Sequence, residues 1–215
     1  MTIMSNFASS FVNFDIPNWF DSQHLTGMLR GIEKEGLRVK PDGFLAQTPH
    51  PAKLGSKLTH PFITTDYSES LLELITEPKA SPKETLNMLR QLHVLVYQGM
   101  PDGELMWPLS MPCMLSSKDE DIPLADYGSS NTGKLKTLYR SGLGIRYGRR
   151  MQTIAGLHYN LSFGDTLFET WQAHSPAAQE QTLTEFKNEK YLGLIRNFKR
   201  LTSIVLYLLG ASPSV

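Results

Sequence analysis

The alternation of apolar and polar residues predicts several short strands in the first half of the chain. Residues 31–39 (GIEKEGLRV) are typical of a strand, and the Pro-Asp-Gly sequence at 41–43 favours a reversing turn that makes a hairpin with residues 44–45. Residues 62–66 form a short run of β-forming side chains, and residues 71–76 are apolar enough for a further strand or a helical turn. A hairpin followed by two strand candidates is therefore expected.

Three later segments predict helices. Ser81 suits the N-cap of a helix over 82–98, Pro82 its first position, and Glu84 lies three residues after the cap. One apolar stripe follows this segment, made of Leu86, Leu89, Leu92 and Val96. Residues 134–146 and 185–209 are also expected to be helical, the second one amphipathic and ending at Gly210. Residues 100–132 are rich in Pro, Gly, Ser and Asp, which favours a long irregular segment.

The longest strand candidate is residues 151–162 (MQTIAGLHYNLS), and its two faces differ. The odd positions are mostly apolar: Met151, Ala155, Leu157, Tyr159 and Leu161. The even positions carry polar groups: Gln152, His158, Asn160 and Ser162. Because successive side chains of a strand point to opposite faces, one face is expected to pack against a core and the other to be polar. His158 is predicted on the polar face.

The composition is that of an ordinary globular chain and excludes several classes of partner. The 215 residues include 21 basic and 21 acidic side chains, so no net charge draws the chain to nucleic acid or to an anionic membrane. The longest apolar run, residues 204–209, is far shorter than the ~20 residues that span a bilayer. The N-terminus lacks the pattern of a signal peptide. A soluble, cytoplasmic protein is expected, with no linker that would divide residues 1–215 into domains.

Several familiar catalytic motifs are excluded. Cys113 is the single cysteine, so a disulfide framework and a cysteine-built zinc site are ruled out, and a small buried residue is expected there. Residues 128–134 (GSSNTGK) match most of the P-loop pattern, but Leu135 occupies the position where Ser or Thr ligates magnesium. No Gly-x-Ser-x-Gly elbow is present. A catalytic nucleophile is therefore not predicted.

The acidic residues of the strand candidates suggest a cation site. Glu33 and Glu35 are two residues apart, so in a strand their carboxylates point to one face, ~7 Å apart. A hard divalent ion between them is one interpretation, and an exposed edge strand with solvated side chains is the other. Asp66, Glu69 and Glu73 follow in an apolar context, where an ion or a Lys or Arg partner is expected.

His158 has three interpretations: a metal ligand, a general base or a structural histidine. Taken singly, its position favours the structural one. Several carboxylates with one histidine and no cysteine would suit magnesium or manganese better than zinc, because hard cations prefer oxygen donors. Such sites commonly bind phosphate groups.

Six segments, in this order, resemble a known family: RGIEKEGLRV, LTHPFITTDYSESLLELIT, MWPLSMPCML, DYGSSNTGKLKTLYRSGLGIRYG, MQTIAGLHYNLSF and IRNFKRLTSIVLYLLGASP. They resemble the glutamate–cysteine ligases (γ-glutamylcysteine synthetases) of the proteobacterial type, from about Leu29 to the last residue. The resemblance implies an α+β fold like that of glutamine synthetase, in which an antiparallel sheet forms a funnel with flanking helices. It also implies ATP-dependent ligation of the γ-carboxylate of glutamate to cysteine, through an acyl phosphate, as the first step of glutathione biosynthesis.

The resemblance also assigns roles to particular residues. The metal-binding side chains, for Mg²⁺ or Mn²⁺, would be Glu33, Glu35, Asp66, Glu73 and His158. Residues around the cysteine substrate would be Tyr67, Tyr139, Arg140, Gln152 and Ile154, and Asn160 would face glutamate or phosphate. The implied partners are glutamate, cysteine and ATP as co-substrate. The chemistry needs positioning and charge stabilisation, with no covalent protein nucleophile.

Members of this family continue well beyond the GASP sequence near residue 213, so the chain is expected to be the N-terminal part of one catalytic domain. A missing C-terminal half is then a further possible partner. Two alternatives to an active ligase remain at this point. One is a noncatalytic fragment, or half of a split ligase, that retains metal or nucleotide binding. The other is a ligase of the same fold that uses a different amine.

Overall fold

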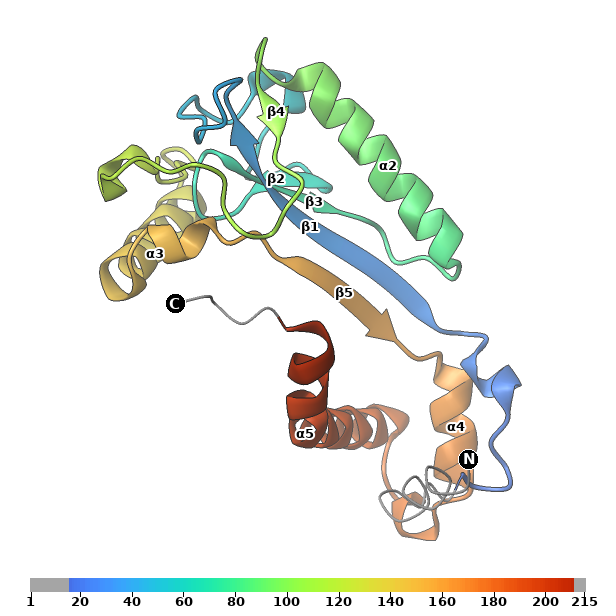
Figure 1. Ribbon diagram of the computed structural model, residues 1–215. Helices are drawn as coiled ribbons and strands as arrows, with labels where there is room; N and C mark the ends of the chain where they lie inside the picture. Colours follow the sequence, from blue (N-terminus) through green and yellow to red (C-terminus); the bar gives the residue numbers. More distant parts are fainter. Residues whose placement is uncertain (1–15, 211–215) are drawn as a thin grey trace, which may run out of the picture. The chain divides into compact units, whose positions relative to one another are not determined.

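The computed structural model describes residues 16–210, which form two compact units (Figure 1). The sheet unit is residues 29–162, and the helical unit consists of the described residues before and after it, 16–28 and 163–210. Both units lie inside the range predicted as part of one catalytic domain, and that assignment stays a prediction. Within residues 16–210, no helix combines the length and the apolar character that crossing a bilayer requires.

The sheet unit is built around one long strand. β1 (Leu29–Val39) pairs antiparallel with β3 (Leu71–Ile75) along one edge, and β2 (Ile63–Thr65) extends the sheet beyond β3. The other partners of β1 are β5 (Leu157–Ser162) and the short β4 (Leu105–Met106), both antiparallel. With its helices, this antiparallel sheet confirms the α+β class. The strands predicted at 31–39, 62–66 and 71–76 are all present.

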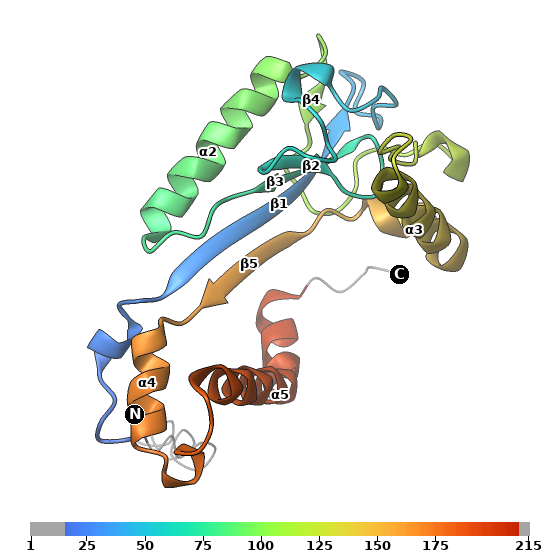
Figure 2. The same cartoon turned by 180° about the vertical axis from the view of Figure 1, so that it is seen from behind.

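Two helices lie on opposite sides of β1 (Figures 1 and 2). α2 (Pro82–Gly99) packs Leu92 and Val96 against Leu72 and Leu74 of β3. On the other side, α3 (Asn131–Tyr147) contributes Leu143 to a second cluster with further residues of the sheet and its loops, among them Leu37, Tyr67, Leu71 and Cys113. Cys113 is buried there, as expected. Leu71 and Leu72 therefore face opposite sides, as a strand requires.

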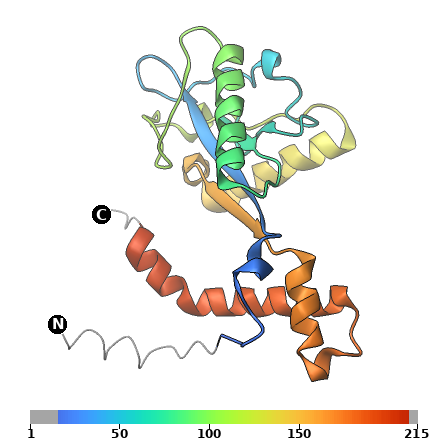
Figure 3. The ribbon, with the colours of Figure 1, turned by 90° about the vertical axis from the view of Figure 1, so that its right-hand side faces the viewer.

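The helix predicted over 82–98 is correct in extent but not in every detail. Ser81 precedes the helix and Pro82 is its first residue, yet the Ser81 side chain makes no capping hydrogen bond. Leu86 was expected on the buried stripe and is exposed. Figure 3 shows α2 running along the sheet, which its middle and C-terminal turns contact through Leu92 and Val96. The stripe therefore begins one turn later than the spacing of leucines suggests.

The turn after β1 and the irregular segment follow the sequence pattern. Gly43 has a φ of 83°, Lys40 and Phe44 close the turn by a hydrogen bond, and the return arm is a single bridge between Val39 and Leu45. Residues 100–130 are mostly irregular, apart from β4 and one 3-10 turn at Asp119–Asp121.

β5 is shorter than predicted. Residues Arg150–Thr153 form a 3-10 helix, so Met151 and Gln152 do not belong to the strand. The alternation of β5 is correct, but Leu157, Tyr159 and Leu161 are exposed, so a core packed against this apolar face is not found among the described residues. Alternation fixes which way side chains point, and it carries no information about what covers each face.

The helical unit contains α4 (Asp165–Ala173) and α5 (Leu183–Leu209). α5 begins with a capping box in which Thr182 and Glu185 bond each other's backbone N–H groups, and it ends at Gly210 as predicted. Phe168 and Phe186 form the buried core of this unit with Ala178. The predicted amphipathic helix over 185–209 is confirmed in its extent.

Candidate functional site

The strand register brings the predicted ligands to one face of the sheet. Glu35 lies opposite Glu73 across β1 and β3, and Glu33 lies opposite His158 across β1 and β5. Directly opposed residues of antiparallel strands project to the same side, as do residues two apart in one strand. All four side chains therefore share the face that is opposite to α2, because their neighbours Leu72 and Leu74 pack on that helix.

Three of these side chains are close enough to share one ion. Glu33, Glu73 and His158 each offer a ligand atom, and the three atoms lie within 4.8 Å of one another. The Nδ1 atom of His158 is 3.2 Å from Glu33 Oε2, while the amide of Asn160 donates to Glu33 Oε1 at 2.7 Å. The glutamates are partly buried and the His158 side chain is 54% exposed, so the cluster is open to solvent on one side.

Glu35 is held beside this cluster by the segment that leads into β5. Its Oε2 atom accepts a hydrogen bond from the backbone N–H of Gly156 at 2.6 Å. A Cβ atom at position 156 would lie 2.9 Å from His158 Nε2 and 3.2 Å from Glu35 Oε1. Glycine at this position therefore leaves open the space between the two predicted ligands.

The charges of the cluster are not balanced by basic side chains. In the part of the chain that the structure describes, no Lys or Arg forms an ion pair with Glu33, Glu35 or Glu73. Burial, together with the nearby carboxylates, raises the pKa of Glu73 to about 7. Burial also raises the pKa of Glu35, against the opposing effect of the Gly156 N–H. The site holds more negative charge than it neutralises.

Asp66 is the first residue after β2 and has a basic neighbour. The Nη2 atom of Arg140, on α3, is 3.4 Å from Asp66 Oδ1. The charge of Asp66 contributes to the raised pKa values of both Glu35 and Glu73. Of the two expectations for these acids, an ion or a basic partner, the second is met for Glu69, which pairs with Lys57. Asp66 has a basic neighbour in Arg140 at the longer distance of 3.4 Å.

The residues present fit a hard divalent cation. Oxygen donors with one imidazole are the set that Mg²⁺ or Mn²⁺ accepts, and like charges held at this spacing without a counterion raise one another's pKa. The open space beside Gly156 adjoins the predicted ligands. A cavity of about 340 Å³ also borders Glu33 and Asn160, with Gly31 and Thr76 in its lining.

The residues predicted around substrates fall into two groups. Asn160 and Arg140 contact the acidic cluster, through Glu33 and Asp66 respectively. Tyr139 and Ile154 are exposed and Gln152 lies in the 3-10 helix after α3, whereas Tyr67 is buried in the core with its hydroxyl unbonded among the described residues. The structure therefore joins the first two to the acids, and among the described residues no hydrogen bond or ion pair joins the other four side chains to them.

Two residues with a bearing on the site were not singled out from the sequence. Gly156 opens the space between Glu35 and His158, and Tyr127 binds the backbone of Asp66. Gly156 had a usable signal, because a glycine just before a polar strand marks a close approach. Tyr127 had none, since its partner is 61 residues away in the sequence.

Comparisons with known proteins agree on one family. A sequence model of the glutamate–cysteine ligase family matches residues 17–215. The glutamate–cysteine ligases of Alcanivorax borkumensis and Hahella chejuensis are 52% and 53% identical to this chain over 89% and 90% of its length. In each comparison the chain spans 36% of the relative, so it corresponds to about a third of those proteins.

Solved structures give the same result. The glutamate–cysteine ligase of Francisella tularensis in complex with AMP superposes with a TM-score of 0.78 at 40% identity, over 87% of this chain and 36% of that one. The bifunctional glutathione synthetase of Pasteurella multocida superposes with a TM-score of 0.77 at 34% identity, over 90% of this chain and 24% of that one.

Proposed function

This chain belongs to the glutamate–cysteine ligase family, and we propose that its sheet unit forms the metal-binding wall of a site that ligates glutamate to cysteine. The fold proposed for the whole site is the glutamine synthetase-like funnel, of which the antiparallel sheet is one part. The reaction proposed is ATP-dependent formation of γ-glutamylcysteine in the cytoplasm, the first step of glutathione biosynthesis. The adenine nucleotide bound in the Francisella relative supports the use of ATP.

The observation that carries this proposal is the uncompensated acidic cluster on one sheet face. Glu33, Glu73 and His158 would hold a divalent ion, with Glu35 and Asp66 as further ligands for it or for a second ion. Mg²⁺ or Mn²⁺, when bound, neutralises charge on the phosphate groups of ATP during transfer. The chain's own residues orient these ligands: Asn160 holds Glu33, and the Gly156 N–H holds Glu35.

The proposed chemistry needs no covalent protein nucleophile. The γ-carboxylate of glutamate attacks the γ-phosphorus of ATP and ADP leaves, after which the amino group of cysteine attacks the acyl carbon and phosphate leaves. Both steps depend on holding the reactants in contact and in the right orientation. In well-oriented reactions, such positioning lowers the activation barrier by roughly 7–11 kcal/mol. Arg140, Tyr67, Tyr139, Gln152 and Ile154 are proposed around the cysteine, and Asn160 near glutamate or phosphate.

Thermal unfolding tests the metal site directly. At a hundredfold excess of Mg²⁺ or Mn²⁺ over its dissociation constant, bound metal should add about 2.7 kcal/mol to the free energy of unfolding. We expect Glu33→Gln to remove most of this gain. Glu77→Gln is the matched control, because Glu77 is exposed, pairs with Lys79 and is not one of the predicted ligands. Equal metal effects on wild type and Glu33→Gln would contradict the proposal.

An activity assay distinguishes a ligase that needs a second piece from a noncatalytic fragment and from a ligase that uses a different amine. The chain is incubated with glutamate, cysteine, ATP and Mg²⁺, alone and with the remaining part of the Hahella relative, and γ-glutamylcysteine is detected by mass spectrometry. We expect product only in the mixture, because the chain spans 36% of that relative. Metal binding without product in the mixture would favour the noncatalytic alternative. Product with an amine other than cysteine would favour a different ligase.

A further inference from the structure

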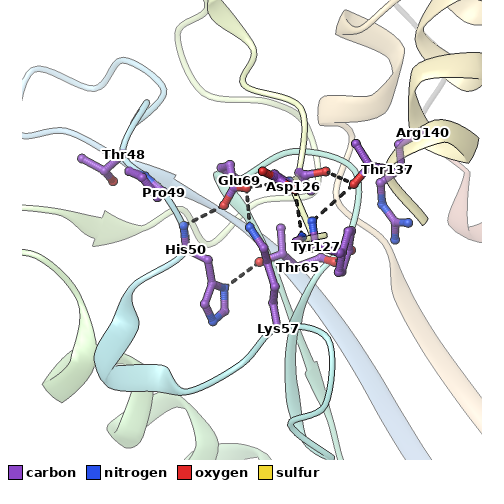
Figure 4. Close-up of polar contacts among 12 residues, drawn as sticks. Thr48, Pro49, His50, Lys57, Thr65, Glu69, Asp126, Tyr127, Thr137 and Arg140 are labelled. Atoms are coloured by element: carbon purple, nitrogen blue, oxygen red, sulfur yellow. Dashed lines mark hydrogen bonds and ion pairs between the residues drawn. The ribbon is translucent and has the colours of Figure 1, made fainter. Parts of the chain in front are cut away.

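Tyr127 belongs to the irregular segment between β4 and α3, and its ring is buried. Its hydroxyl is within hydrogen-bond distance of two successive backbone carbonyls: that of Asp66, at 3.0 Å, and that of Thr65, which is closer. Tyr127 and Thr65 are labelled in Figure 4. Burial raises the pKa of Tyr127 to about 12, so the hydroxyl keeps its proton at neutral pH and acts as a donor. A side chain distant in sequence therefore holds the end of β2.

Arg140, on α3, also binds Asp66. Its Nε atom donates to the carbonyl oxygen of Asp66, and its Nη2 atom lies 3.4 Å from the Asp66 carboxylate. The guanidinium lies 4.6 Å from the centre of the Tyr127 ring, so the two side chains also contact each other. Asp66 is thus bound by two side chains that come from different segments.

Tyr127 is itself fixed in place. Its backbone N–H donates to the Thr137 hydroxyl at 3.3 Å, and the preceding N–H, of Asp126, donates to Glu69 Oε1 at 2.7 Å (Figure 4). The ammonium group of Lys136 lies 5.1 Å from the centre of the ring. The buried Glu69 and the first turns of α3 therefore set the position from which the hydroxyl reaches Asp66.

The position of Asp66 matters because the sheet does not determine it. Glu33, Glu35, Glu73 and His158 all lie in paired strands, whereas Asp66 follows the last residue of β2. Its N–H bonds the Leu71 carbonyl across the turn, and its own carbonyl is left for side chains to bind. Without those side chains, the backbone bearing this carboxylate would be held on one side only.

We propose that Tyr127 is a positioning residue for the metal site, and that its hydroxyl, with Arg140, holds Asp66 where its carboxylate reaches the ion. This inference rests on the proposed function, because it assigns Tyr127 a role only if Asp66 is a ligand. Residues that orient metal ligands commonly change metal affinity about 10- to 100-fold when they are removed.

The test measures Mn²⁺ affinity by the electron paramagnetic resonance signal of the free ion. We expect Tyr127→Phe, which keeps the ring and loses the hydroxyl, to bind Mn²⁺ about 10-fold more weakly than wild type. The matched control is Thr85→Val. It also removes a buried hydroxyl, bonded to the Ser81 carbonyl, but Thr85 lies on α2, on the other face of the sheet from the acidic cluster. The control should destabilise the metal-free chain and leave the Mn²⁺ affinity unchanged.

Each outcome has a distinct meaning. If wild type does not bind Mn²⁺, the proposed metal site and this inference are both overturned. If wild type binds and Tyr127→Phe binds equally well, or if Thr85→Val weakens binding as much, Tyr127 has a structural role alone and only this inference is overturned. Should Tyr127→Phe fail to fold, Arg140→Lys carries the test, because it keeps the charge and loses the Nε bond to Asp66. Unchanged affinity in that variant would likewise overturn the inference.

Discussion

The sheet unit contains two sets of partly or fully buried carboxylates that differ in how their charge is compensated. Glu69 accepts hydrogen bonds from the backbone N–H groups of His50 and Asp126, both at 2.7 Å, and pairs with Lys57. Glu104 pairs with Arg38 and accepts from the Thr48 hydroxyl. By contrast, Glu33, Glu35 and Glu73 have one exposed histidine among them and no basic partner within residues 16–210.

The difference separates carboxylates that stabilise the fold from carboxylates whose mutual repulsion destabilises it. Arg38 has no exposed surface, and besides Glu104 and Thr48 it binds the carbonyl groups of Pro49 and Glu69. This compensated set ties the loops around residues 48–57, 66–70 and 104 to β1. The uncompensated set repels itself on a rigid sheet, which costs stability unless a cation is bound. Local charge balance therefore separates the structural carboxylates from those proposed as metal ligands.

The largest expected effect is on the compensated set. Glu69→Gln removes the charge that pairs with Lys57. It also replaces one carboxylate oxygen by an NH₂ group, which cannot accept a hydrogen bond from a backbone N–H. Breaking a buried pair in this way typically costs about 3–5 kcal/mol. Urea unfolding followed by circular dichroism measures the loss, with Glu77→Gln as the control for removing an exposed glutamate. A loss below ~1 kcal/mol would show that the network around Glu69 contributes little.

For the uncompensated set, substituting a carboxylate is expected to raise the free energy of unfolding of the metal-free chain. The folded state raises the pKa of Glu73 from 4.5 to about 7, so between these values the folded chain binds more protons than the unfolded chain. Stability from this group therefore falls as the pH rises from 4.5 to 7, and the full penalty is present above pH 7. Glu73→Gln should stabilise the metal-free chain at pH 8 by up to about 3 kcal/mol.

The measurement compares urea unfolding of wild type and Glu73→Gln in EDTA at pH 5 and pH 8. The stabilisation should be larger at pH 8, and it should vanish or reverse when Mn²⁺ is added, because the variant lacks a proposed ligand. A variant that is less stable than wild type at both pH values would mean that Glu73 is compensated after all.

A smaller effect is expected at Gly156, which lies beside the uncompensated carboxylates and His158. Gly156→Ala places a methyl group 2.9 Å from His158 Nε2, so the flexible imidazole must move while the backbone keeps its conformation. We expect a Mn²⁺ affinity about 10-fold lower, similar to the loss of an orienting residue, and a melting temperature within a few degrees of wild type. Gly142→Ala is the control, because the nearest atom to its added Cβ is the end of the Arg146 side chain at 3.6 Å. Equal affinities would place the ion away from His158.

Much of this contrast is present in the sequence, and the rest is not. Spacing predicts that Glu33 and Glu35 share one face, and parity predicts that His158 and Asn160 share a polar face. The register confirms both and shows that the two faces are the same. Parity succeeded although β5 is half as long as expected, because it depends only on residues 157–162. Regular periodicity is a local property, so it places residues on faces reliably.

Charge compensation is not local, and the sequence could not reveal it. Glu69 and Glu73 lie in one apolar run and look equivalent, yet only Glu69 meets Lys57 and the Asp126 N–H. Those partners come from loops 12 and 57 residues away, whose paths no periodic pattern encodes. The resemblance to a known family separated Glu73 from Glu69, whereas the residues alone left an ion and a basic partner as equal alternatives for both.

Carboxylates in solvent-exposed ion pairs are expected to have the smallest effect on stability. Asp119 lies 2.9 Å from Arg150, and each side chain is 44% exposed, so water screens the pair and both side chains lose rotational freedom in forming it. Asp119→Asn should therefore change the free energy of unfolding by less than about 1 kcal/mol, and 0.5 M NaCl should shrink that change further. The measurement is urea unfolding at low and high salt, beside Glu69→Gln, whose larger loss should persist because a buried pair is screened less. A loss at Asp119 as large as that at Glu69 would mean that burial is not what gives the compensated carboxylates their effect.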